Sequence, residues 1–374
     1  MDDATRRRFL KAAGVAGVAG LAGCSGQSEE GPDSAPAQIG SGRSPFGDRT
    51  IEGGTSMAAM PAMSGELTVY SGRGEPLVGE LVGFLQERYA DLTLSVRYNS
   101  AAELVNQLQT EGGQSPADVF FSVNAGSLGA VKDQGRTTSL PDEVLELVPS
   151  QFRDPDGTWV GTSGRARSVP YNTEALSDGD VPDDIFAFPE TEALRDSIGC
   201  APTYSSFQAF VTAMRVLNGE DRTREWLNGM LELGLDTSYS DEFLVSQAVA
   251  DGELRAGFAN HYYILRVQAG RPDAPIATAF TRNDAGAIFN VAGAAPLDTA
   301  DDPDLAANFV RHLLSAEAQD YFARETFEYP LVPEVDPIGA LPPIDELAPP
   351  EDLDLTQLSD LEGTVELLRE VGVL

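Results

Sequence analysis

Strand and helix signals alternate along residues 67–98, LTVYSGRGEPLVGELVGFLQERYADLTLSVRY. The apolar run 67–70 predicts a short buried strand, and Pro76 suits the first turn of a helix. Alternating apolar and polar residues over 92–98 predict a second strand. Within the helix, apolar residues recur with a helical period and predict one core-facing stripe, made of Leu77, Leu81, Phe84 and Leu85.

The same alternation continues downstream. Ser100 and Glu103 have the spacing of a capping box, which predicts the start of a second helix, and the run 117–121 predicts a third strand. Strands that alternate with helices of this length imply right-handed crossovers and a parallel sheet, with a ligand site outside the carboxyl ends of the strands. Toward the C-terminus, 304–324 is predicted as one long amphipathic helix, before a Pro- and acid-rich stretch over 333–352.

The first residues resemble an export signal. Thr5-Arg6-Arg7-Arg8-Phe9-Leu10-Lys11 precedes an apolar run and then Leu21-Ala22-Gly23-Cys24, as in a twin-arginine signal joined to a lipobox. Residues 1–23 are therefore expected to be removed, with a lipid on the sulfur of Cys24 and the protein anchored to the outer face of the cytoplasmic membrane. Residues 24–64, rich in Gly, Ser, Pro and acid, are expected to form a flexible tether. Cys200 then has no cysteine partner and is expected to be a small buried residue.

Composition limits the partners. The 374 residues carry a formal net charge of −34, and Lys11 and Lys132 are the only lysines among 25 basic residues. At molar salt the Debye length falls to ~3 Å and screens such a surface, so the composition indicates a hypersaline habitat. No basic stripe is present that would displace phosphate counterions, which excludes nucleic acid as a partner. We expect a monomer.

Several segments together carry a family resemblance. They are Thr68–Arg73, Ser115–Phe121, Ser163–Arg167 with Tyr171-Asn172, Asn260–Tyr263, and Phe309–Ser315 with Gln319 and Glu328–Leu331. In this order they resemble the bacterial and archaeal ferric-iron-binding proteins of ABC importers, here of a haloarchaeal lipoprotein type.

The resemblance implies an α/β protein with the two-lobed type II periplasmic-binding-protein fold. Each lobe would be a mixed, mainly parallel sheet flanked by helices. Lobe 1 would comprise 65–166 with 292–345, and lobe 2 would comprise 167–291 with 346–374. The lobes would close on a ligand like a hinge and present it to the permease and ATPase subunits.

The resemblance also implies a metal site made of tyrosines. Ferric iron prefers anionic oxygen donors, and a phenol binds it by giving up its proton, so binding depends on pH. Tyr262 and Tyr263 match the family's paired tyrosine ligands, and Tyr204 falls where several members supply a further tyrosine. The alternative is that Tyr262 and Tyr263 are packing aromatics of lobe 2 and that Tyr204 belongs to an ordinary loop.

The chain departs from the family pattern at two positions. Many members place a histidine after the first strand and a carboxylate after the third, where this chain has Gly74 and Val123. His261 is next to the tyrosine pair, but neighbours on an extended strand point to opposite faces. His261 is therefore not expected to bind the metal, and His312, within the long helix, is expected to be structural.

An anion such as carbonate or phosphate is expected beside the iron. Ser205 and Ser206 are predicted to open a helix, whose N-terminus is a natural anion site. Asn124 and Asn260 match positions that line the family's anion pocket, and Arg73 and Arg165 are candidate charge partners. Glu242 occupies a position where relatives often carry an anion-binding asparagine, so it disfavours an anion there or adds a carboxylate ligand. Each of these side chains can equally be a structural hydrogen-bonding group.

Three other functions compete with iron binding. The first is the same fold binding an organic or oxyanion solute, such as thiamine, a polyamine or a phosphonate. The second is an exported enzyme, which is disfavoured because the chain has two histidines, no Gly-x-Ser-x-Gly elbow and no His-Glu-x-x-His motif. The third is a purely structural surface protein. Colour separates iron from the rest, because phenolate-to-iron charge transfer absorbs visible light.

Overall fold

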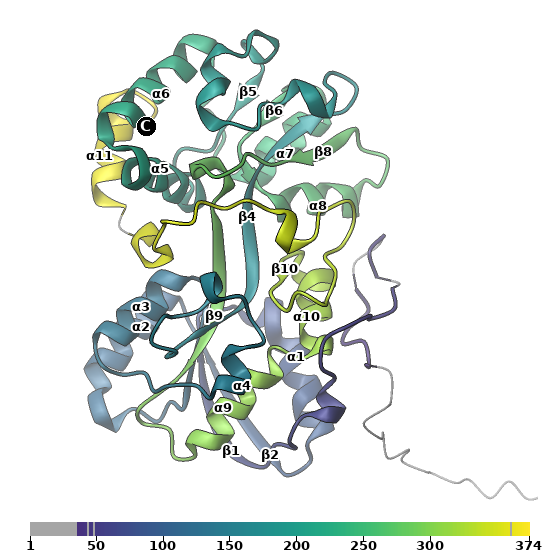
Figure 1. Ribbon diagram of the computed structural model, residues 1–374, viewed down its shortest axis with the longest axis vertical. Coiled ribbons are helices and arrows are strands. Elements are labelled where there is room, and N and C mark those ends of the chain that lie inside the picture. Colours follow the sequence, from purple (N-terminus) through teal and green to yellow (C-terminus); the bar gives the residue numbers. More distant parts are fainter. Residues whose placement is uncertain (1–35, 43–44, 48, 360) are drawn as a thin grey trace, which may run out of the picture.

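The computed structural model describes residues 36–42, 45–47, 49–359 and 361–374 and shows two α/β lobes stacked along its long axis (Figure 1). The expected two-lobed architecture is therefore confirmed. The export signal and Cys24 lie outside the described residues. Within those residues, every helix is too short or too polar to cross a membrane.

Lobe 1 is built on a mixed sheet. Its parallel part has the order β2-β1-β3, and β3 then pairs antiparallel with β9, which pairs antiparallel with β4. The strands are β1 (Gly65–Ser71), β2 (Leu92–Tyr98), β3 (Val119–Ser122), β4 (Val160–Asn172), β9 (Phe289–Pro296) and β10 (Tyr329–Pro330). The helices are α1 (Glu75–Arg88), α2 (Ala101–Glu111), α3 (Ala125–Asp133), α4 (Asp142–Leu145), α9 (Pro303–His312) and α10 (Ala316–Tyr321).

Lobe 2 holds short strands around the far half of β4. Within it β5 and β6 pair in parallel, whereas β6, β7 and β8 each pair antiparallel with β4. The strands are β5 (Ile198–Gly199), β6 (Ala256–Gly257), β7 (Ala259–Asn260) and β8 (Ile276–Ala279). The helices are α5 (Ser205–Asn218), α6 (Glu220–Leu233), α7 (Glu242–Ala250), α8 (His261–Gly270) and α11 (Glu362–Glu370). The sheets are less parallel than strand-helix alternation implies, because β4 and β9 oppose their neighbours.

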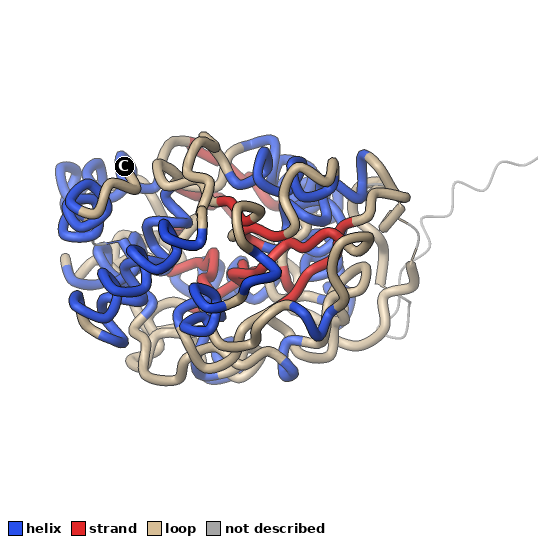
Figure 2. The backbone as a smooth tube through the Cα atoms, turned by 90° about the horizontal axis from the view of Figure 1, so that it is seen from above, coloured by secondary structure: helices blue, strands red, loops and turns tan. Residues whose placement is uncertain are grey.

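Two separate cores support the lobes, and Figure 2 shows helices surrounding the strands. One core draws on residues 39–166 and 289–344, and the other on 169–288 and 358–373. The chain crosses between lobes along β4, along the segment that leads into β9, and a third time along a C-terminal strap, residues 344–358. The strap packs apolar residues into both cores: Ile344 belongs to the first and Leu358 to the second.

The local predictions for the first strands and helices are confirmed, including the cap at Ser100, whose hydroxyl accepts the Glu103 amide. Two details differ. Leu77 is 37% exposed, and Val78 joins Leu81 and Leu85 on the buried face of α1 instead. The long helix predicted over 304–324 is broken between α9 and α10, where Ser315 caps the new helix by accepting an amide.

The predicted flexible tether over 24–64 is wrong for its described part. Ile39, Met57 and Met63 belong to the core of lobe 1, and Ile51 and Met60 are also buried. Scattered single apolar residues have no helical or strand period, so the sequence pattern did not reveal this packing.

His312 is structural, as expected. It is fully buried, its Nε2 lies 2.7 Å from the Tyr89 hydroxyl, and its Nδ1 lies 2.8 Å from the Asn308 carbonyl oxygen. A carbonyl oxygen can only accept, so Nδ1 carries the proton and Nε2 accepts from Tyr89. Burial lowers the pKa of His312 to about 4.

The free energy of unfolding should therefore fall as the pH is lowered from about 6.5 to about 4. In this window the unfolded chain binds a proton at His312 and the folded chain does not, which costs up to about 1.4 kcal/mol per pH unit. In His312→Gln, which cannot titrate, urea unfolding at several pH values should show a shallower decline than the parent. Parallel declines in the two proteins would contradict this assignment.

Candidate metal centre

Three phenol groups lie close together in lobe 2, and Tyr262 among them packs against residues of lobe 1. Tyr204 is the N-cap residue of α5, and Tyr262 and Tyr263 stand in the first turn of α8. The hydroxyls of Tyr204 and Tyr263 hydrogen-bond to each other, and the rings of Tyr262 and Tyr263 have centroids 4.4 Å apart. The structure thus brings together residues 59 positions apart in the chain.

The start of α8 positions the side chains of Tyr262 and its neighbour His261. Asn260 is the N-cap residue of α8, and its side-chain amide donates to the Tyr262 hydroxyl at 3.2 Å. His261 is buried on the other side of the first turn, where its Nε2 lies 2.8 Å from the Phe327 carbonyl of lobe 1. The expected extended strand is therefore a helix. The His261 ring stands edge-on to the Tyr262 ring, but both of its nitrogens face backbone groups, those of Ala166 and Phe327, and not the phenol hydroxyls.

Burial keeps the two phenols of α8, Tyr262 and Tyr263, protonated in the metal-free protein. It raises the pKa of Tyr262 to about 12, against a lowering effect of the nearby Arg165 guanidinium. It also raises the pKa of Tyr263, and the neighbouring Tyr262 and Tyr204 add to that effect. A highly charged cation that displaces these protons would supply the missing positive charge.

Arg165 lies at the junction of the lobes. It is half-buried, and its Nη2 donates to the carbonyl of Val123 at the end of β3. Burial opposes the charge on Glu328, but Arg73 and Arg165 outweigh this effect and hold the pKa of that carboxyl below its usual range. Arg165 therefore lies between a lobe-1 carboxylate and a lobe-2 phenol.

Arg73 belongs to a closed network within lobe 1. Its side chain is fully buried, its Nη1 donates to the Ser163 hydroxyl at 2.8 Å, and its Nη2 lies 2.7 Å from Glu328. Ser163 in turn donates to the same carboxylate at 2.7 Å. The geometry thus favours a structural role for Arg73 over contact with a cleft anion.

The carboxylate of Glu242 also binds other groups of the protein. One carboxylate oxygen pairs with buried Arg167, and the other accepts the Asn260 amide at 2.9 Å. Both oxygens already have a partner, so a role as metal ligand would require this pair to break. Arg167 was not among the predicted site residues. Its position two residues after Arg165, on the same face of a strand, could have indicated it.

The remaining predicted anion-site residues stand at helix starts. Ser205 and Ser206 are the first residues of α5, and the Ser206 hydroxyl is buried without a partner among the described residues. Asn124 is the N-cap of α3, and its side chain accepts the Ser127 amide at 2.8 Å. Of these residues, Ser206 therefore has a buried hydroxyl that is free to donate.

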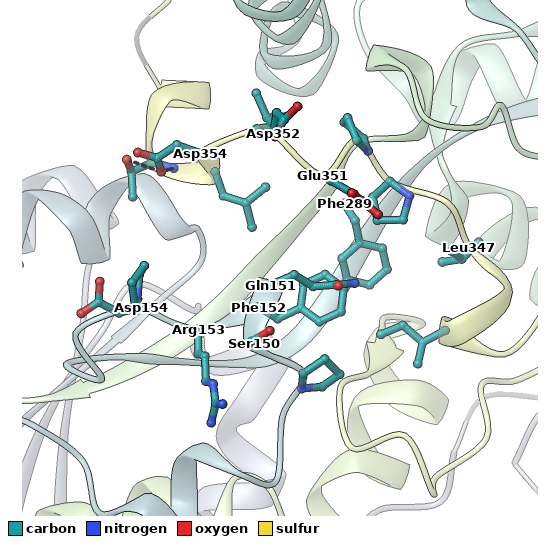
Figure 3. Close-up of a pocket in the computed structure, with 18 of the residues that line it drawn as sticks. Ser150, Gln151, Phe152, Arg153, Asp154, Phe289, Leu347, Glu351, Asp352 and Asp354 are labelled. Atoms are coloured by element: carbon teal, nitrogen blue, oxygen red, sulfur yellow. Dashed lines mark hydrogen bonds between the residues drawn. The ribbon is translucent and has the colours of Figure 1, made fainter.

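Among the described residues, no group of three His, Cys, Asp or Glu side chains is placed to hold a metal ion. A cavity of about 950 Å³ lies elsewhere, under the strap, and none of the three tyrosines lines it. Figure 3 shows Phe152 and Phe289 together in this cavity, with Asp352 and Asp354 on the strap. The tyrosine cluster is therefore the candidate metal centre.

Cys200, in the core of lobe 2, is buried, which raises its pKa and leaves it unsuited to metal binding.

The chain matches known proteins over most of its length. The family model for bacterial extracellular solute-binding proteins covers residues 114–356. The major ferric iron-binding protein of Neisseria meningitidis serogroup A is 32% identical over 327 residues, which are 84% of this chain and 95% of the relative. The chain belongs to the bacterial extracellular solute-binding proteins.

Solved structures agree with this membership. Iron-bound HitA from Pseudomonas aeruginosa superposes on this solute-binding protein with a TM-score of 0.68 and 26% identity, covering 83% of this chain and all of the other. The Trichodesmium protein FutA, in complex with iron and citrate, gives a TM-score of 0.71 at 22% identity over 83% of this chain and all of its own, which supports the fold alone.

Removal of the Glu242 carboxylate should destabilise this solute-binding protein. Glu242→Ala leaves Arg167, which is 1% exposed, without its counter-ion, and breaking such a buried pair costs about 3–5 kcal/mol. Glu192→Ala breaks the exposed pair with Arg195 and serves as the control, with little expected change. Urea unfolding at constant salt measures both, and equal small losses would show that the buried pair is not needed.

Proposed function

We propose that this protein is the extracytoplasmic solute-binding component of an ABC importer and that its cargo is ferric iron. The observation that carries the proposal is the convergence of three phenol groups, from Tyr204, Tyr262 and Tyr263, of which Tyr262 packs against lobe 1. Three phenolates neutralise one Fe³⁺, and phenolate is among the hardest anionic donors that a protein offers. The neisserial relative and the Pseudomonas structure, both described as iron-binding, support the same cargo.

The rest of the site would complete the coordination with an anion. The free Ser206 hydroxyl, the α5 N-terminus and the half-buried Arg165 are the groups available to hold carbonate, phosphate or a carboxylate such as citrate. Closure then needs only contacts with the loaded ion that are better satisfied when the lobes are together.

The proposal includes delivery of the iron to the membrane components of the importer. A lipid on Cys24 would hold the protein at the outer face of the membrane, where a permease with its ATPase subunits receives the iron. The acidic, lysine-poor composition suits operation in high salt. No catalytic step is proposed, in line with relatives that are described as binding proteins.

Visible absorption spectroscopy tests whether the cargo is ferric iron. The purified protein should become coloured on addition of ferric citrate at high salt and neutral pH, through phenolate-to-iron charge transfer. Tyr262→Phe should lose most of this band. It should bind iron at least about tenfold more weakly than the parent, since even the loss of a residue that only hydrogen-bonds to a metal ligand lowers metal affinity ~10–100-fold. Tyr98→Phe, on β2 of lobe 1, is the matched control and should behave like the parent. A colourless parent would refute iron as the cargo.

Iron binding should also release protons. Tyr262 and Tyr263 are protonated before binding because their pKa values are raised, that of Tyr262 to about 12, so each of them gives up one proton when it binds iron and the affinity rises with pH. Proton release on loading can be followed by titration in weakly buffered solution, against the release by ferric citrate alone. Tyr262→Phe should release about one proton fewer than the parent. Equal release would show that Tyr262 does not ligate the iron.

A further inference from the structure

The N-terminal arm, residues 36–42, 45–47 and 49–64, is anchored on lobe 1 beside the lobe junction. Arg49 Nε lies 2.6 Å from Asp320, and the same fully buried carboxylate holds Arg324 at 2.6 Å. Arg324 also donates to the Ile39 carbonyl of the arm at 2.8 Å. The arm is thus bound to the end of α10 and to the π-helical turn Phe322–Thr326 that follows it.

That turn ends at the residue that meets the tyrosine helix. Phe327 adopts a left-handed conformation, with φ at +61°, and its carbonyl lies 2.8 Å from Nε2 of His261. Because a carbonyl only accepts, Nε2 carries the proton, and Nδ1 accepts the Ala166 amide at 3.2 Å. His261 therefore ties lobe 1 and strand β4 to the first residue of α8, next to Tyr262.

An apolar cluster surrounds this bond and includes the arm. Leu265 of α8 packs with Ala323, Phe327 and Ile338 of lobe 1, and Tyr262 packs against the same cluster. Phe46 of the arm stands edge-on to Phe327, with ring centroids 5.8 Å apart and an interplanar angle of 80°. Three parts of the chain therefore share one small core.

We propose that Phe46, Phe327, His261 and Leu265 form a latch, which couples docking of the N-terminal arm to the contact between α8 and lobe 1. Movement of α8 away from lobe 1 must break the hydrogen bond between His261 and Phe327 and must expose Leu265, which packs against Phe327. The arm helps to bury Phe327. Docking of the arm and the contact of α8 with lobe 1 therefore stabilise each other, and the coupling is reciprocal. The consequence for cargo, slower release while the arm is docked, rests on the proposed function.

Hydrogen–deuterium exchange of the metal-free full chain tests the latch without reference to any ligand. In Phe46→Ala, amides of the first turns of α8 should exchange several-fold faster than in the parent, together with those of 322–330. Phe46→Leu keeps apolar bulk and should resemble the parent. Val216→Ala, at an exposed site of lobe 2, controls for general loosening. Faster exchange confined to the arm and 322–330, with α8 unchanged, would overturn the latch.

Release of cargo is measured separately. Iron-loaded Phe46→Ala should lose its visible band several-fold faster than the parent on addition of a competing chelator, while Phe46→Leu keeps the parental rate. Parental rates in Phe46→Ala, despite faster exchange in α8, would overturn the effect on release. If the parent never becomes coloured, the iron cargo fails, and the exchange experiment still decides the latch.

Discussion

Strand β4 hydrogen-bonds to partners in both lobes along its 13 residues, and this ladder sets how the two sheets lie relative to each other. The strand also places charge at the junction. Arg165 contacts the end of β3 in lobe 1, and Arg167, two residues on, pairs with Glu242 in lobe 2. Since Glu242 also accepts the amide of Asn260, the start of the tyrosine helix is aligned with β4.

The electrostatics of the junction suit a small ion of high charge. Tyr263 is buried and Tyr204 and Tyr262 are half-buried, and this burial keeps the two tyrosines of α8 neutral until something replaces their protons. The nearby carboxylates do not compete for the ion, because Glu328 and Glu242 already face the guanidinium groups of Arg73 and Arg167. A neutral organic solute would gain nothing from phenolate formation, whereas a trivalent cation gains from each proton that it displaces.

Much of this arrangement was predictable from local pattern. Apolar periodicity located β1, α1 and β2, and the spacing of Ser100 and Glu103 located the start of α2, because these signals depend only on neighbours in the chain. The expectation that Tyr204 joins Tyr262 and Tyr263 in one site came from family resemblance, since no local signal relates residues so far apart. The partners of Arg73 and Glu242 and the packing of Ile39, Met57 and Met63 on lobe 1 depend on tertiary contacts, which no local sequence pattern indicates.

The strap that lines the cavity gives the two lobes a third covalent link, which would restrict any hinge motion between them. Two crossings side by side allow the lobes both to bend and to twist about each other. A third crossing at a distance, held at Ile344 in one core and Leu358 in the other, resists the twist and leaves bending as the softer mode. The prolines at 349 and 350 stiffen this link, so its length and rigidity offer a means of tuning the opening angle from outside the binding site.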